Sequence, residues 1–111
     1  MPLDFGDVLL VSFPFTSQAA SKKEPAVVVS SRQYNTGRAD VVVAAVTSQL
    51  RANIRFGEVG ITEWTAAGLL KPSVVKPVFA TLEQSLIIRK MGSLRSADAE
   101  ALRKALARVL S

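Results

Sequence analysis

The stretch DVVVAAVT, residues 40–47, decides the fold of this chain. Between its first and last residue it is wholly apolar, with no polar residue alternating along it. Such a run is typical of a central strand that is buried on both faces. The stretch AVVVS, residues 26–30, has the same character and follows a proline. The two stretches predict the central strands of one sheet.

Weaker patterns extend this sheet in both directions. Further strands are predicted at residues 8–13, 54–59 and 73–81, the second by its alternation of apolar and polar residues. Pro77 inside the last of these predicts an edge or a bulge. The connections are predicted as a loop at residues 16–24, a turn at residues 34–38 and a short helical turn at residues 62–68.

The C-terminal residues change to a helical period. From Ser96 onward one apolar stripe is formed by Ala99, Leu102, Leu106, Val109 and Leu110. Ser96 is predicted to cap this amphipathic helix. The sum is a mostly β (α+β) domain spanning residues 1–111, in which five or six short strands form a strongly curved sheet or small barrel closed by one helix.

The amino-acid composition limits which catalytic and metal-binding groups the chain can use. The chain has 111 residues, the size of one domain, and contains no cysteine and no histidine. Disulfides, thiolate metal sites, cysteine nucleophiles and the commonest general acid and base are therefore excluded. The nine acidic residues are scattered without the spacing of metal ligands, and the six glycines form no phosphate-binding motif. We expect neither a bound metal nor a cofactor.

The net charge of +5 favours an anionic partner. No apolar stretch approaches the roughly 20 residues that a membrane span needs. The first ten residues carry two aspartates and no basic leader. We therefore expect a cytoplasmic protein without a membrane partner.

Hydroxyls and cations gather where predicted strands end. Thr47 is the last residue of the buried stretch, Ser48 follows it, and Arg51 comes three residues later. Lys22 and Lys23 lie near the end of the first long loop. Hydroxyl groups orient phosphate oxygens and cations neutralise them, so this pattern suits an RNA phosphate. A solvated lysine pair and a simple turn after a strand would give the same pattern, and the residue types alone leave both interpretations open.

The order of the segments is more specific than any one of them. The segments are GDV at 6–8, FPFT at 13–16, KKEPAVVV at 22–29, VVAAVTS at 42–48, AGLLKPSVVKP at 67–77 and TLEQSLIIRKMGSL at 81–94. In this order, and at this chain length, they resemble the MazF/PemK family of toxins from bacterial toxin–antitoxin pairs. The resemblance covers nearly the whole chain.

The resemblance implies a fold, an activity and partners. The fold is a small SH3-like β-barrel of the MazF/PemK/CcdB type with a C-terminal helix, and it forms a homodimer. The activity is that of a metal-independent endoribonuclease that cleaves single-stranded RNA at short sequences. In that reaction the 2′-hydroxyl attacks the phosphorus and leaves a 2′,3′-cyclic phosphate. The restraining partner is a cognate antitoxin with an acidic tail.

The same resemblance assigns candidate site residues. Thr47 matches the family's active-site threonine, and Ser48 beside it is a second donor. The family's arginine, which stands immediately before the Pro-Ala or Pro-Val step, is replaced here by Glu24. That arginine serves as acid or base and stabilises the phosphorane, so the replacement predicts impaired activity. The RNA-binding residues implied are Thr16, Ser17, Gln18, Ser21, Lys22, Lys23, Gln49, Arg51, Lys71, Ser73 and Lys76.

Two other functions remain open at this point. The chain could be a catalytically inactive relative that binds RNA or an antitoxin through the same groove. It could also be a toxin that poisons DNA gyrase, because such toxins share the barrel and need no RNA-cleaving residues. The motifs quoted above resemble those of the RNA-cleaving toxins more than those of the gyrase-poisoning toxins.

Overall fold

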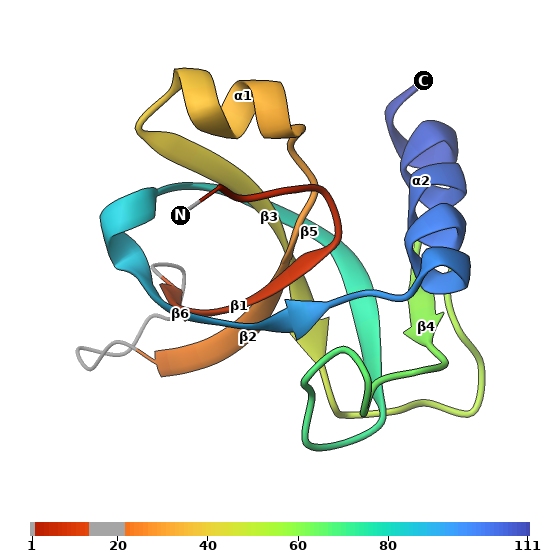
Figure 1. The fold of residues 1–111 in the computed structure, drawn as a ribbon. Coiled ribbons are helices and arrows are strands. Elements are labelled where there is room, and N and C mark those ends of the chain that lie inside the picture. Colours follow the sequence, from red (N-terminus) through yellow and green to blue (C-terminus); the bar gives the residue numbers. More distant parts are fainter. Residues whose placement is uncertain (1, 14–21) are drawn as a thin grey trace.

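The computed structural model describes residues 2–13 and 22–111. Its elements are β1 (Asp7–Phe13), β2 (Lys22–Val28), α1 (Arg32–Gly37), β3 (Asp40–Thr47), β4 (Val59–Ile61), β5 (Ser73–Glu83), the 3₁₀ turn η1 (Gln84–Leu86), β6 (Ile87–Ser93) and α2 (Ser96–Leu110). The six strands pair antiparallel in the order β4-β5-β3-β2-β1-β6. The sheet curls into a half-barrel, as predicted, and α2 lies outside the curl (Figure 1).

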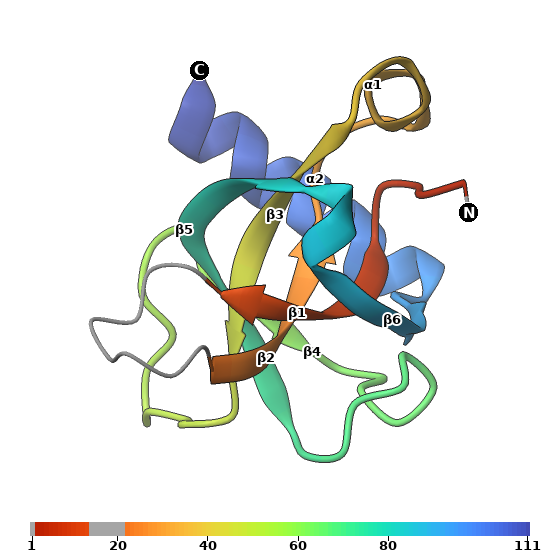
Figure 2. The same ribbon diagram turned by 90° about the vertical axis from the view of Figure 1, so that its left-hand side faces the viewer.

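Both faces of the curled sheet are buried. Leu9, Val28 and Val43 belong to a core on one face, whereas Val27 and Ala44, their neighbours in sequence, belong to a second core on the other face. The second core includes side chains of α2, which lies behind the sheet in the view of Figure 2. The double burial predicted for the central strands is confirmed, with β3 in the interior of the sheet.

Two strand predictions need correction. The strand predicted to follow Pro25 begins at Lys22, and Pro25 itself pairs with Leu10 of β1. Residues 54–58 do not form a strand, because the backbone closes a turn between Arg55 and Glu58, and strand β4 begins only at Val59. The alternation of residues there reflects a turn whose side chains are half-buried or exposed, not a ladder of hydrogen bonds.

The connections also differ in part from the predictions. Residues 34–38 were expected to form a turn, but most of them belong to α1, which is capped by the Ser31 hydroxyl accepting from the Tyr34 amide. The turn at residues 62–68 contains one α-helical hydrogen bond, from the Ala67 amide to the Glu63 carbonyl, and ends at Gly68, which has a positive φ. Strand β6 was not predicted as a strand. It lies at an edge of the sheet, where polar side chains interrupt the apolar pattern.

The C-terminal helix and the bulge agree with the sequence. The register between β3 and β5 shifts around Pro77, as that proline predicts. Helix α2 buries Leu102 but leaves Leu110 70% exposed, so the apolar stripe is covered only in its middle part. The N-cap is Arg95 without a side-chain hydrogen bond, and not Ser96. No helix in the described ranges has the length and apolar character needed to cross a membrane.

Candidate functional site

Thr47 lies where β3 leaves the sheet. It pairs with Val74 of β5, and its hydroxyl oxygen accepts a hydrogen bond of 3.1 Å from the Gln49 amide. This bond turns the chain away from the sheet and fixes the Thr47 side chain. Because the hydroxyl accepts here, its proton stays available for donation to a ligand.

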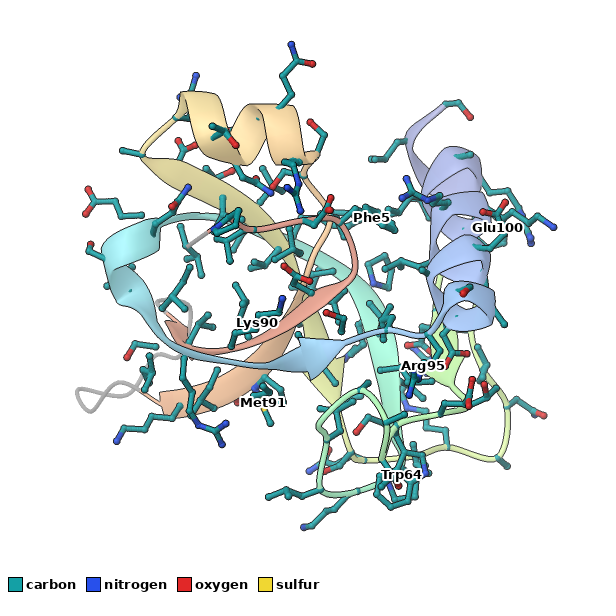
Figure 3. All side chains as sticks on the ribbon, viewed as in Figure 1. Phe5, Trp64, Lys90, Met91, Arg95 and Glu100 are labelled. Carbon is teal, nitrogen blue, oxygen red and sulfur yellow. The ribbon has the colours of Figure 1, made fainter. Side chains whose placement is uncertain are left out.

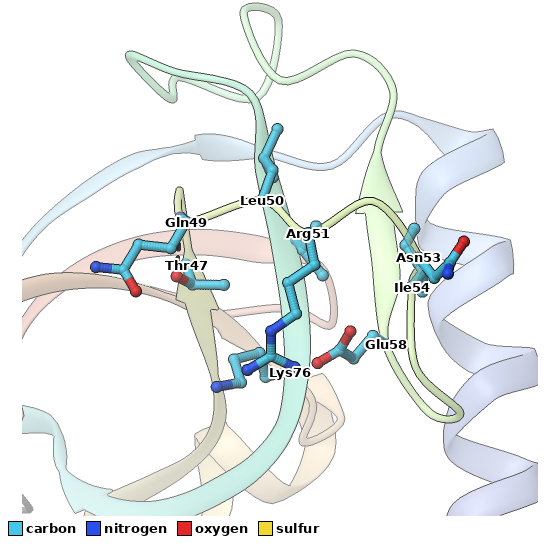
Figure 4. A pocket seen from close by; sticks show the side chains of 9 residues that line it. Thr47, Gln49, Leu50, Arg51, Asn53, Ile54, Glu58 and Lys76 are labelled. Carbon is cyan, nitrogen blue, oxygen red and sulfur yellow. Dashed lines mark hydrogen bonds between the residues drawn. The ribbon is translucent and has the colours of Figure 1, made fainter.

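A hollow of about 250 Å³ opens beside Thr47. Four of its lining residues were predicted from the sequence, namely Thr47, Gln49, Arg51 and Lys76. The others are Leu50, Asn53, Ile54, Glu58 and Val74. Figure 4 shows the side chains of Arg51, Lys76 and Glu58 close together, with Thr47 at the end of β3. The hollow therefore combines a hydroxyl, two amides, two cations and one carboxylate.

Glu24 lies in β2, the strand that neighbours β3. It pairs with Val11 of β1 and is half-buried. On its other side β2 pairs with β3 at Ala26–Ala45, Val27–Ala44 and Val28–Val43, and this pairing ends two residues before Glu24. The residues that line the hollow do not include Glu24. Lys23 is exposed and, by the alternation of a strand, points to the other face.

Other predicted site residues do not line this hollow. Ser48 is exposed directly after Thr47, and Lys71 is exposed in the connection before β5. Ser73 is buried, and its hydroxyl donates a 2.8 Å hydrogen bond to the Lys71 carbonyl. Ser73 and Arg51 line a second hollow that adjoins the first. Thr16, Ser17, Gln18, Ser21 and the side chain of Lys22 lie outside the residues that the structure describes.

Glu58 lines the hollow and is not among the residues predicted from the sequence. It is half-buried, and one of its carboxylate oxygens accepts a 2.9 Å hydrogen bond from the Arg55 amide. The alternation of polar and apolar residues at 54–59 predicts a half-exposed strand and gives no sign that Glu58 lines a hollow. In the described part of the chain, no three acidic, histidine or cysteine side chains are grouped as ligands of a metal would be.

The marked pKa shifts lie at the opposite end of β3 from Thr47. The side-chain hydrogen bond from Arg38 lowers the pKa of Asp40, and the hydrogen bond to Asp40 raises the pKa of Tyr34. Asp40 begins the strand that Thr47 ends. These groups stabilise the start of β3 and contribute nothing to the chemistry of the hollow.

Comparisons with known proteins identify the family of this chain and solved structures of similar fold. The family model described as "PemK-like, MazF-like toxin of type II toxin-antitoxin system" matches residues 4–110. None of the curated proteins that were compared by sequence matches the chain.

Three solved structures illustrate the likeness of fold. An endoribonuclease in complex with its cognate antitoxin, from a mycobacterial species, is 21% identical with a TM-score of 0.79, covering 97% of this chain and 94% of that one. The Mycobacterium tuberculosis toxin MazF-mt6 is 21% identical with a TM-score of 0.74, covering 92% and 93%. MazF from Deinococcus radiodurans is 21% identical with a TM-score of 0.75, covering 99% and 97%. At this identity the likeness shows the fold alone.

Proposed function

We propose that this chain, which belongs to the PemK-like, MazF-like toxin family of type II toxin–antitoxin systems, is an endoribonuclease that cleaves single-stranded RNA without a metal. The observation that supports the proposal is the hollow at the end of β3, where Thr47, Arg51 and Lys76 lie together. The mycobacterial protein of similar fold is an endoribonuclease. A hydroxyl and two cations are the groups that hold and neutralise an RNA phosphate.

The proposed reaction uses a nucleophile from the RNA. The ribose 2′-hydroxyl attacks the adjacent phosphorus, the bond to the 5′-oxygen breaks, and the products carry a 2′,3′-cyclic phosphate and a 5′-hydroxyl. Thr47 orients the scissile phosphate with its hydroxyl proton, and Ser48 supplies a second donor. Arg51 and Lys76 stabilise the extra negative charge of the phosphorane. The protein then needs neither a cysteine nor a histidine, and it has neither.

Glu24 weakens this reaction in the chain as it stands. A carboxylate in place of an arginine changes the charge near the phosphate by two units. Each unit at a few ångströms is worth on the order of 1–4 kcal/mol near a protein surface. We therefore expect slow cleavage, because transition-state stabilisation falls while the binding of the remaining phosphates by cations persists.

The test is an RNA-cleavage assay on four proteins. Glu24→Arg is expected to cleave at least about tenfold faster than the unchanged chain, since tenfold corresponds to only about 1.4 kcal/mol. Thr47→Ala in the Glu24→Arg background removes most of that gain. Thr81→Ala in the same background is the matched control, because Thr81 is an exposed threonine of β5 paired with Val42, away from the hollow.

Two results would contradict the assignment. If Glu24→Arg and the unchanged chain are equally inactive, the role given to position 24 is wrong. If Thr47→Ala cleaves as fast as its parent, the site itself is wrong. Salt-dependent RNA binding without any product would instead favour the catalytically inactive binding protein.

The proposal includes two protein partners. A cognate antitoxin with an acidic tail suits the net charge of +5, and a related structure was solved in complex with its antitoxin. A homodimer is part of the proposal, with a mass in solution of twice 11.9 kDa.

A further inference from the structure

We propose that Glu58 selects the base that enters the hollow, favouring a base with an exocyclic amino group over uracil. The proposal deepens the proposed function, since it takes single-stranded RNA as the ligand of the same hollow. It concerns recognition and not the bond-breaking step.

The carboxylate of Glu58 is held in place before any ligand arrives. Its Oε1 accepts a 2.9 Å hydrogen bond from the Arg55 amide, and the Glu58 amide donates a 3.0 Å hydrogen bond to the Arg55 carbonyl. Gly57 within this turn has a φ of +87°, and a Cβ there would lie 2.9 Å from Val109 of α2. The turn is therefore closed on itself and packed against the helix, so the carboxylate can act as a preorganised acceptor.

The hollow holds charges of both signs, and the Glu58 carboxylate lies beside the Arg51 guanidinium in Figure 4. Arg51, Lys76 and the Thr47 hydroxyl attract a phosphate, whereas the Glu58 carboxylate repels one (Figure 4). When RNA binds with its phosphate against the cations, the group left to occupy the space at Glu58 is an uncharged base. The carboxylate thus faces a base edge.

The free oxygen of Glu58 sets the preference. Oε2 makes no hydrogen bond within residues 2–13 and 22–111, and an ionised carboxylate only accepts. Cytosine presents its N4 amino group and adenine its N6 amino group as donors to such an acceptor. Uracil presents two carbonyl oxygens around a single N–H, and a carboxylate repels both oxygens. Amino-bearing bases are therefore favoured.

The experiment measures binding without cleavage. Short 2′-O-methyl homopolymers of A, C and U lack the attacking hydroxyl, and their affinities are compared by fluorescence anisotropy at one salt concentration, because phosphate contacts depend on salt. The unchanged chain is expected to bind oligo-A or oligo-C about tenfold more tightly than oligo-U, the discrimination of one base-edge contact.

Glu58→Gln is the informative variant. It keeps an oxygen for the Arg55 amide but replaces the other by an amino donor, so oligo-U should bind as tightly as oligo-C or more so. Glu100→Gln is the matched control, since Glu100 is exposed on the outer side of α2 (Figure 3) and its removal changes the net charge equally. The control should keep the original ratio.

The outcomes separate this proposal from the proposed activity. An altered ratio in Glu58→Gln supports base selection even if unmodified RNA is never cleaved. An unaltered ratio, an equal change in Glu100→Gln, or loss of binding to all three homopolymers in Glu58→Gln overturns it, because the carboxylate would then only close its turn.

Discussion

Gly68 and Gly92 allow two backbone segments to approach more closely than any side chain would permit. Gly68 ends the turn at residues 62–68 with a φ of +88°, and a Cβ on it would lie 2.2 Å from the Met91 carbonyl oxygen. A Cβ on Gly92 would lie 2.4 Å from the Ala67 carbonyl oxygen. The turn is thereby held against β6.

Gly68→Ala should lower the free energy of unfolding by at least about 2 kcal/mol, since a left-handed backbone at a non-glycine residue costs about 1–3 kcal/mol and the clash with Met91 adds to it. Gly37→Ala is the matched control, because Gly37 has no positive φ and nothing lies within 4 Å of the added Cβ. Urea unfolding of both variants measures the difference. Equal stabilities would mean that the backbone moves aside without cost.

Glu24 and Glu58 show how the same side chain acquires different consequences from its position. Glu24 lies in β2, at the position where the resemblance to the family implies a cation, so its charge would oppose the proposed chemistry. Glu58 lies in a turn and lines the same hollow as Arg51 and Lys76, where its charge would repel a phosphate and favour a base. The first could be recognised by comparing motifs. The second could not, because its role depends on how residues 48–58 fold back over β5.

At the scale of elements, the sequence predicted those whose burial pattern is regular. The strands around residues 8–13, 41–47 and 73–81 and the C-terminal helix were identified because packing dictates their apolar spacing. Strand β6 was not predicted because it lies at an edge of the sheet, where Arg89 and Lys90 interrupt the apolar pattern. Helix α1 was not predicted because its six residues have almost no apolar pattern. The Ser31 cap and the buried Asn35 stabilise it instead.

Asp98 attaches helix α2 to the turn that follows β4. It is buried, and its carboxylate accepts hydrogen bonds from the amide and hydroxyl of Thr62 and from the Glu63 amide, at 2.8–3.1 Å. Its place in the first turn also suits the positive end of the helix dipole. No pattern in the sequence indicated this connection, because its partners lie 35 and 36 residues away.

Asp98→Ala should therefore destabilise the protein by about 2–4 kcal/mol, as hydrogen bonds to a charged group contribute about 1.5–3 kcal/mol each when measured singly and are not additive. Glu100→Ala, two residues along on the exposed face, should change stability by no more than about 0.5 kcal/mol. Chemical denaturation followed by far-UV circular dichroism checks both. If Asp98→Ala lowers the free energy of unfolding no more than Glu100→Ala does, water replaces the Asp98 carboxylate as the acceptor of these three hydrogen bonds without cost.

At the scale of the whole molecule, the two cores share their strands. Strands β1, β2, β3 and β5 each contribute alternate side chains to both cores, whereas α2 and β4 contribute to one only. A strand cannot leave one core and keep its place in the other, so the shared strands couple the two faces of the sheet. We therefore propose that residues 1–111 unfold as one cooperative domain.

Trp64 makes this coupling measurable, because the only tryptophan of the chain packs against one core and not the other. Val28→Ala, a change in the opposite core, should lower the free energy of unfolding by about 2 kcal/mol. In a cooperative domain the urea transitions seen by Trp64 fluorescence and by circular dichroism coincide and shift together, whereas Val78→Ala, at a residue 46% exposed, leaves them in place. A circular dichroism transition that shifts while the fluorescence transition stays would instead show that the two faces of the sheet unfold separately.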